Sequence, residues 1–125
     1  GLRLSWLIIH HAVSLPDFVR ECLIQMRLAG AERDYLMDLA AYTEDKVSFL
    51  EGRAQIYGTH LDWVDGELKI TPIEDGAQVN IRRRAVGLPP LDPNSPPVIQ
   101  ERPPKDPMKK AKEFTEWLKR VGWRL

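Results

Sequence analysis

The chain has 125 residues, a mass of 14.4 kDa and 43% hydrophobic residues, which suits one domain with a modest core. Its 18 basic and 18 acidic residues cancel, which argues against nucleic acid or an anionic membrane as a partner. The single cysteine, Cys22, excludes an intrachain disulfide and a cysteine-based zinc cage, and fits a cytoplasmic location. No apolar run approaches the roughly 20 residues of a membrane span.

The N-terminal part of the chain predicts two helices. Residues 2–12 are apolar nearly all round, which indicates a buried helix, although a central strand has a similar composition. A second helix is expected to run to about Ala29. Its start is marked by Ser14 as the N-cap and Pro16 in the first turn, and Gly30 is its expected stop.

A third helix is predicted from Glu32 to Glu51, with Gly52 ending it. One face is apolar, and the opposite face mixes aromatic and carboxylate side chains, because residues three, four and seven apart share a helix face. We therefore expect a central helix that is contacted on both sides, with Asp45 partly shielded from water. The mixed face consists of Asp38, Tyr42, Asp45 and Phe49.

A β-hairpin follows. Asp65-Gly66 is a preferred two-residue hairpin turn and predicts antiparallel strands over 61–64 and 67–70. The turn sets Leu61 opposite Ile70, so that alternate residues share one apolar face. That face consists of Leu61, Trp63, Leu68 and Ile70.

Polar residues precede the hairpin. If the strand alternation continues backwards, Gln55, Tyr57 and Thr59 face the covered side, while His60 points outward and Gly58 permits close approach of a backbone or a ligand. Buried polar groups need hydrogen-bond partners. Two interpretations remain open: a wall that binds a small polar ligand, or a structural network that holds the hairpin to the helices.

The remaining segments are a short helix, an arm and a terminal helix. Asp75 and Gln78 resemble a capping box that opens a helix ending at Gly87. Eight of the ten prolines lie in residues 89–107, which indicates an extended arm. From about Met108 the chain has helical periodicity and is expected to dock on its own domain.

The predicted fold is mainly α, of the α+β class, with four to five helices and one β-hairpin. Residues 1–91 form the helical domain with the hairpin, residues 92–107 the proline-rich arm, and residues 108–125 the C-terminal amphipathic helix. The hairpin must pack on the helices, because an isolated two-stranded hairpin is marginally stable in water.

Four ordered runs carry a family resemblance: WLIIHHA, YTEDKV, EGRAQIYGTH and PIEDGAQVNIRRRAVGLPPL. Over about residues 4–91 they resemble domain-of-unknown-function family 6624. Its members show Gln-His-Ala, Asp-Arg-Val and Gln-x-Tyr-Gly-Thr-Gln elements and a Pro-Ile-Asp/Glu…Arg-Arg…Val-Gly-Leu ending. The resemblance implies a mainly bacterial protein and supplies no activity. It directs attention to His11, Asp45, Gln55, Tyr57, Gly58, Thr59 and Arg83.

The chain departs from the family pattern at several positions. His10 replaces a glutamine, Lys46 replaces an arginine, and His60 replaces the final glutamine of the polar run. Arginine and lysine are not equivalent where a planar group is bound by two hydrogen bonds. If that arginine is essential in relatives, this copy binds differently or has lost activity.

His11 is the candidate acid or base, with Asp45 as the carboxylate that sets its tautomer; the alternative is a histidine at the edge of the core, bonded to backbone. A metal site from His10, His11 and His60 is disfavoured, because adjacent histidines on a helix point about 100° apart. No metal ligand is therefore assigned, and the cofactor stays unknown. The chain has no nucleophile elbow, phosphate loop or zinc spacing.

Two hypotheses follow. In the first, a pocket binds a small polar ligand and has acid or base catalysis as its weaker extension. In the second, the polar cluster is structural, and residues 89–125 bind a protein partner or a second copy of the chain. The candidate catalytic residues are His11 and Asp45, and the candidate ligand-binding residues are Gln55, Tyr57, Gly58, Thr59, Lys46 and Arg83.

Overall fold

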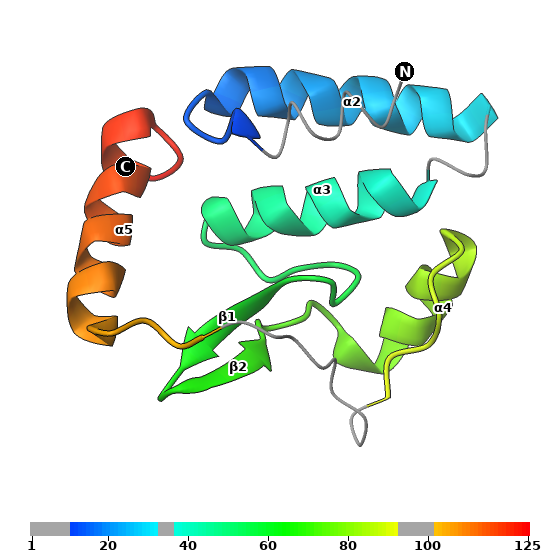
Figure 1. Ribbon diagram of the computed structural model, residues 1–125. Coiled ribbons are helices and arrows are strands. Elements are labelled where there is room, and N and C mark those ends of the chain that lie inside the picture. Colours follow the sequence, from blue (N-terminus) through cyan, green and yellow to red (C-terminus); the bar gives the residue numbers. More distant parts are fainter. Residues whose placement is uncertain (1–10, 33–36, 93–101) are drawn as a thin grey trace.

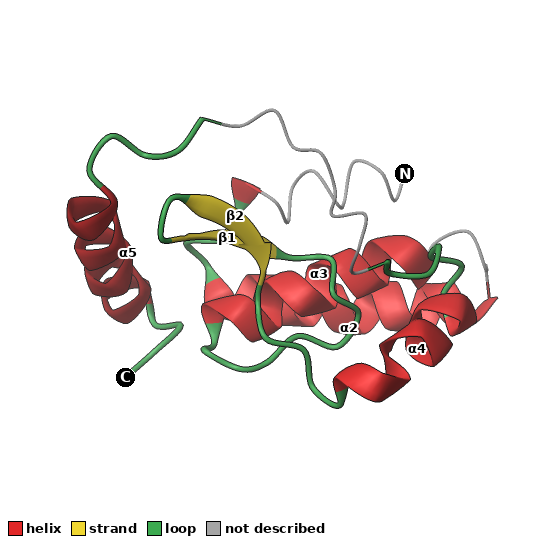
Figure 2. Cartoon of the chain, turned by 90° about the horizontal axis from the view of Figure 1, so that it is seen from below, coloured by secondary structure: helices red, strands yellow, loops and turns green. Residues whose placement is uncertain are grey.

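The computed structural model describes residues 11–32, 37–92 and 102–125 (Figure 1). Within these residues it contains four α-helices and one two-stranded antiparallel hairpin, which confirms the mainly-α, α+β class. Helix α3 lies between α2 on one side and the hairpin with α4 on the other, and α5 stands across one end of α2 and α3 (Figures 1 and 2). Residues 2–10 of the first predicted helix lie outside the described residues.

Helix α2 spans Pro16–Glu32, and its ends differ from the prediction. Ser14 is not the N-cap, because the helix begins directly at Pro16 and the carbonyl of Leu15 accepts the first helical bond. The fixed φ of proline suits the first helical position, which moves the boundary by one residue. Gly30 does not stop the helix, since one glycine inside a helix costs only about 1 kcal/mol.

Helix α3 spans Met37–Leu50 and is the central helix, as predicted, although it starts later than Glu32. It ends at Leu50, and Gly52, two residues further on, has a φ of 78°, the left-handed conformation expected just after a helix. The burial is not confined to one stripe, because neighbours cover the helix on several sides. Its buried residues are Ala40, Ala41, Thr43, Asp45, Val47, Ser48 and Leu50.

Helix α5 spans Pro107–Val121 and packs on α2 and α3. Leu118 is fully buried in the core cluster that these three helices share. Trp123 follows the helix, and its indole N–H donates to the carbonyl of Val13 at 2.6 Å. Arg124 donates to two carbonyls at the C-terminus of α3, those of Phe49 and Leu50. The terminal helix is thus fixed by both apolar and polar contacts. Other buried members of the cluster are Val19, Leu23, Met26, Ala40, Val47 and Leu50.

The hairpin has the predicted register. Strand β1 (Leu61–Val64) pairs with β2 (Glu67–Ile70), with Leu61 opposite Ile70 and Val64 opposite Glu67. Asp65 and Gly66 have φ values of 51° and 80°, as a turn with two left-handed central residues requires.

The strand alternation does not continue backwards from Leu61, so that part of the prediction is wrong. Residues 55–60 form a loop, in which Gln55 makes one isolated bridge to Ile73. His60 does not point outward: its ring lies against that of Phe49, tilted by 32°, with the ring centroids 4.1 Å apart. The reason is that amides of this segment bind a side chain of α3 instead of a neighbouring strand.

The segment after the hairpin is a 3₁₀ turn, Gly76–Gln78, followed by α4, Val79–Ala85. The predicted capping box is absent. Asp75 has a left-handed φ of 43° and makes no side-chain cap bond, whereas N-cap residues usually have extended backbone angles. Gly87 follows the helix with a φ of 77°, in keeping with its predicted role as a stop. The division at residues 91 and 107 stays a prediction.

Candidate functional site

The carboxylate of Asp45 is the centre of the polar cluster. It is fully buried on α3 and accepts four hydrogen bonds from the loop that precedes the hairpin. Oδ1 accepts from the amides of Ile56 and Tyr57 at 2.8 and 2.9 Å. Oδ2 accepts from the amide and the hydroxyl of Thr59 at 2.9 and 2.7 Å. Hydrogen bonds to an ionised group are stronger than neutral ones, so Asp45 holds the loop firmly on α3.

Gln55 closes the other end of this loop. Its side chain is fully buried, and its Oε1 accepts from the amide of His60 at 2.8 Å. Its Nε2 donates to the carbonyls of His60 and Thr71 at 3.0 and 2.9 Å. The side-chain amide therefore joins the start of the loop to the residue before β1, His60, and to the residue after β2, Thr71.

Two arginines of α4 bind the loop from the opposite side. Arg83 is buried, and its Nη1 donates to the carbonyl of Tyr57 at 2.7 Å while its Nε donates to that of Pro89 at 2.6 Å. Arg82 donates from Nε to the carbonyl of Ile56 at 2.8 Å. The third arginine of the run, Arg84, is exposed.

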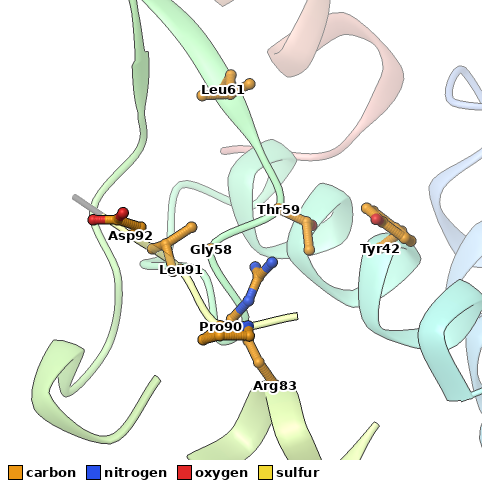
Figure 3. Close-up of a pocket in the computed structure, with 8 residues that line it drawn as sticks. All are labelled: Tyr42, Gly58, Thr59, Leu61, Arg83, Pro90, Leu91 and Asp92. Carbon is orange, nitrogen blue, oxygen red and sulfur yellow. The ribbon is translucent and has the colours of Figure 1, made fainter. Parts of the chain in front are cut away.

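A pocket of about 480 Å³ lies beside the loop, between α3, α4 and the chain that follows α4. Figure 3 shows the guanidinium of Arg83 directed towards Gly58 and Thr59, with Tyr42 on one side and Leu91 on the other. The pocket is lined by Tyr42, Gly58, Thr59, Leu61, Arg83, Pro90, Leu91 and Asp92.

Two donors in this lining have no acceptor among the described residues. The Arg83 guanidinium uses Nε and Nη1, and Nη2 has no hydrogen bond to any residue that the structure describes. Among the loop amides, those of residues 55, 56, 57, 59 and 60 all have acceptors, whereas the amide of Gly58, a buried residue, has none in the described part of the chain. Unpaired buried amides are rare in folded proteins.

A family model matches residues 1–95, and its description is a family of unknown function, DUF6624. The chain belongs to DUF6624. No curated protein and no solved structure matched it. The match covers α3, the hairpin and α4, which together build the pocket, whereas α5 lies beyond it.

Three of the residues predicted to bind a ligand line the pocket of this DUF6624 chain: Gly58, Thr59 and Arg83. Gln55 is enclosed by its own hydrogen bonds. The Tyr57 ring packs against the cluster of Ala41, Val86 and Leu88, and burial, followed by the charge of Glu44, raises the pKa of its phenol. Neither Gln55 nor Tyr57 lines the pocket, and both hold the loop in place through contacts away from it.

The two predicted catalytic residues do not come together. Within the described residues, the hydrogen bonds to Asp45 come only from the 56–59 loop. His11 is exposed and is not part of the pocket lining. The role of His11 stays a prediction, but the structure offers no geometry in which Asp45 sets its tautomer.

Lys46 lies near His60 and Asp62 and does not line the pocket. Burial lowers the pKa of the Lys46 ammonium, and Asp62 partly opposes this shift. Burial, followed by the charge of Lys46, lowers the pKa of His60 to about 4, against the opposing effect of Asp62 and Asp45. This imidazole is therefore neutral at physiological pH.

The sequence interpretation missed part of the lining. Tyr42 lines the pocket, and the only feature of the sequence that pointed to it was its place on the mixed face of the third predicted helix. Pro90, Leu91 and Asp92 were assigned to the arm and its boundary, because a proline-rich composition says nothing about what a segment covers.

The described residues contain no cluster of three or more histidine, cysteine, aspartate or glutamate side chains able to hold a metal ion. In the same residues, no helix has the length and apolar composition needed to cross a membrane.

Proposed function

We propose that the protein binds a small ligand in the pocket lined by Tyr42, Gly58, Thr59 and Arg83. One observation carries this proposal. The Arg83 side chain is only 8% exposed, faces the pocket and forms no ion pair within the described residues. Burying a guanidinium is costly because it takes the charge out of water, and proteins retain such costs mainly at functional sites.

The polar cluster behind the pocket has a positioning role in this proposal. Asp45 and Gln55 direct their hydrogen bonds to the backbone of the loop, so they fix where Gly58 and Thr59 stand. We do not include catalysis, since neither of the two predicted catalytic residues lines the pocket. Asp45 is fully occupied by the loop, and His11 does not line the pocket.

The alternative, in which residues 89–125 bind a protein partner or a second copy, has less support. Two large apolar side chains of this segment, Leu118 and Trp123, already pack into the core of this chain. We also propose a cytoplasmic location, which the free thiol of Cys22 supports, and a bacterial source, which the family resemblance supports.

Titration of the ¹⁵N-labelled protein with a chemically diverse library of small molecules tests the pocket. The expected result is that amide shifts on binding gather at Gly58, Thr59 and Leu91. Tyr42→Ala should weaken binding, and Phe18→Ala is the matched control, because the two residues are 43% and 46% exposed and only Tyr42 lines the pocket. A library without binders, or equal losses in the two variants, would contradict the proposal.

A further inference from the structure

We infer that the ligand carries a carboxylate group, which the guanidinium of Arg83 and the amide of Gly58 bind together. This inference rests on the proposed function and names the chemical class of the ligand. It depends on the donors that line the pocket, on the acceptors and charges beside them, and on the apolar side chains of the remaining wall.

The guanidinium supplies the positive charge. Two carbonyls, those of Tyr57 and Pro89, occupy its Nη1 and Nε and hold its plane in place. Carbonyl groups satisfy hydrogen bonds but do not cancel a full charge. Because a guanidinium has five N–H donors in a rigid fork, the Nη2 side remains available to an oxygen anion in the pocket.

The Gly58 amide supplies the second donor. Its neighbours on both sides, the amides of Tyr57 and Thr59, are bound by Asp45, and the amide between them has no acceptor in the described residues. The left-handed φ of 70° at Gly58 rotates this peptide relative to its neighbours. An amide without a protein acceptor is a donor that a ligand oxygen in the pocket can satisfy.

The acceptors of the pocket favour a carboxylate over a phosphate. The hydroxyl of Thr59 donates its proton to Asp45, so towards the pocket it can only accept. The carboxylate of Asp92 belongs to the same lining and opposes a dianion. The two donor groups match the two oxygens of a carboxylate, and Asp92 opposes its single charge less than the double charge of a phosphate. A phosphate dianion has more oxygens than these two donor groups can bind and more negative charge than one guanidinium can offset.

The remaining side chains of the pocket indicate the chemical character of the rest of the ligand. Leu61, Pro90, Leu91 and the ring of Tyr42 provide apolar walls. The volume of about 480 Å³ is that of a small-molecule site. The expected class is therefore a compact carboxylic acid with an apolar or aromatic body, such as phenylacetate.

The test compares phenylacetate with its neutral amide, phenylacetamide, and with inorganic phosphate on the wild-type protein at constant ionic strength. We expect phenylacetate to bind at least tenfold more tightly than either of the others and to move the Gly58 amide proton downfield. Equal binding of the acid and the amide would refute the inference while leaving the pocket intact. Tighter binding of phosphate would refute the carboxylate assignment. If none of the three binds while other library compounds bind at the pocket, the inference fails and the proposed function stands.

A pair of variants separates the two arginines of α4. Arg83→Lys keeps the charge but loses the planar fork, so phenylacetate should bind at least tenfold more weakly. Arg82→Lys is the matched control, because Arg82 binds the same loop through the Ile56 carbonyl without lining the pocket. Equal affinity in the two variants would exclude Arg83 as the recognition group. If Arg83→Lys does not fold, the comparison of acid, amide and phosphate on the wild type still decides.

Discussion

Asp45 and Arg83 bind the two ends of one residue, Tyr57: the carboxylate accepts from its amide at 2.9 Å and the guanidinium donates to its carbonyl at 2.7 Å. One group comes from the central helix and the other from α4, on opposite sides of the loop. Two charge-assisted hydrogen bonds thus fix the residue that precedes Gly58. A loop held in this way presents its pocket-facing groups without having to be ordered by a ligand, which lowers the cost of binding.

Replacing Asp45 by asparagine tests how much the carboxylate contributes. Asparagine is nearly the same size, but its side chain ends in one acceptor oxygen and one NH₂ donor. The NH₂ group would therefore meet loop donors that now bind a carboxylate oxygen. We expect Asp45→Asn to lower the free energy of unfolding by about 2–4 kcal/mol, measured by urea denaturation. Asp65→Asn is the control, because Asp65 is exposed and asparagine tolerates its φ of 51°. Similar losses in the two variants would show that the four hydrogen bonds contribute little.

A second prediction concerns Gly58, and Gly66 serves as its matched control. A Cβ at Gly58 would lie 3.0 Å from Ile73 Cδ1 and 3.3 Å from Leu91 Cδ2, whereas a Cβ at Gly66 would meet nothing within 4 Å. Both residues have left-handed φ values, 70° and 80°, so both alanine variants carry the backbone strain of roughly 1 kcal/mol. Only Gly58→Ala adds a steric clash, and we expect it to destabilise the protein by about 1 kcal/mol more than Gly66→Ala.

The origin of the difference can be checked with a double variant. Ile73→Val removes the Cδ1 atom that lies nearest to the added methyl group. In the Gly58→Ala background it should therefore cost less than in the wild type, which a double-mutant cycle measures directly. Additive effects of the two substitutions would count against a steric origin.

The sequence predicted the hairpin well and the adjoining loop poorly, for a physical reason. The Asp65-Gly66 turn is local, so it fixed which residues pair across the strands. The conformation of residues 55–60 depends on Asp45, which lies on another element, 11 to 14 residues before the groups that it binds. Strand alternation carries no information about such a partner, and it therefore placed His60 on the wrong side.

The candidate site shows the same limit. Local patterns and the family resemblance drew attention to Gly58, Thr59 and Arg83, which line the pocket. They did not separate residues that line the pocket from residues that support it, such as Asp45 and Gln55, because that distinction is set by which hydrogen bonds are already satisfied in the fold. The hydrogen bond from the Trp123 indole to the Val13 carbonyl joins the two ends of the described chain. Nothing in the sequence around either residue predicts it.

His60 predicts a pH dependence of stability. Its pKa falls from 6.5 to about 4 on folding, chiefly through burial. Between these values the unfolded chain binds more protons than the folded one, so the free energy of unfolding rises with pH across this window. This contribution is fully present above pH 6.5 and is lost as the pH falls towards 4. After allowing for partial exposure of the ring, the loss is about 2 kcal/mol.

Two variants check this assignment by urea denaturation at a series of pH values. His60→Gln removes the titrating group and should flatten the slope between pH 4 and 6.5. Lys46→Gln removes the charge that adds to the lowering of the His60 pKa, so the imidazole should titrate at a higher pH in an NMR titration. An unchanged slope in His60→Gln would assign the pH dependence to other groups.

Helix α5 lies beyond the residues that the DUF6624 model matches, yet it contributes to the core, and this makes the last prediction. Leu118 is 0% exposed among side chains of α2 and α3, so Leu118→Ala leaves a cavity and should lower the free energy of unfolding by about 2–5 kcal/mol. Met108→Ala on the same helix is the control, because Met108 is 85% exposed and should change stability by less than about 0.5 kcal/mol. Since α5 contributes no residue to the pocket lining, phenylacetate should bind folded Leu118→Ala as it binds the wild type. A loss as small as that of Met108→Ala would mean that α5 is not part of the cooperative core in solution.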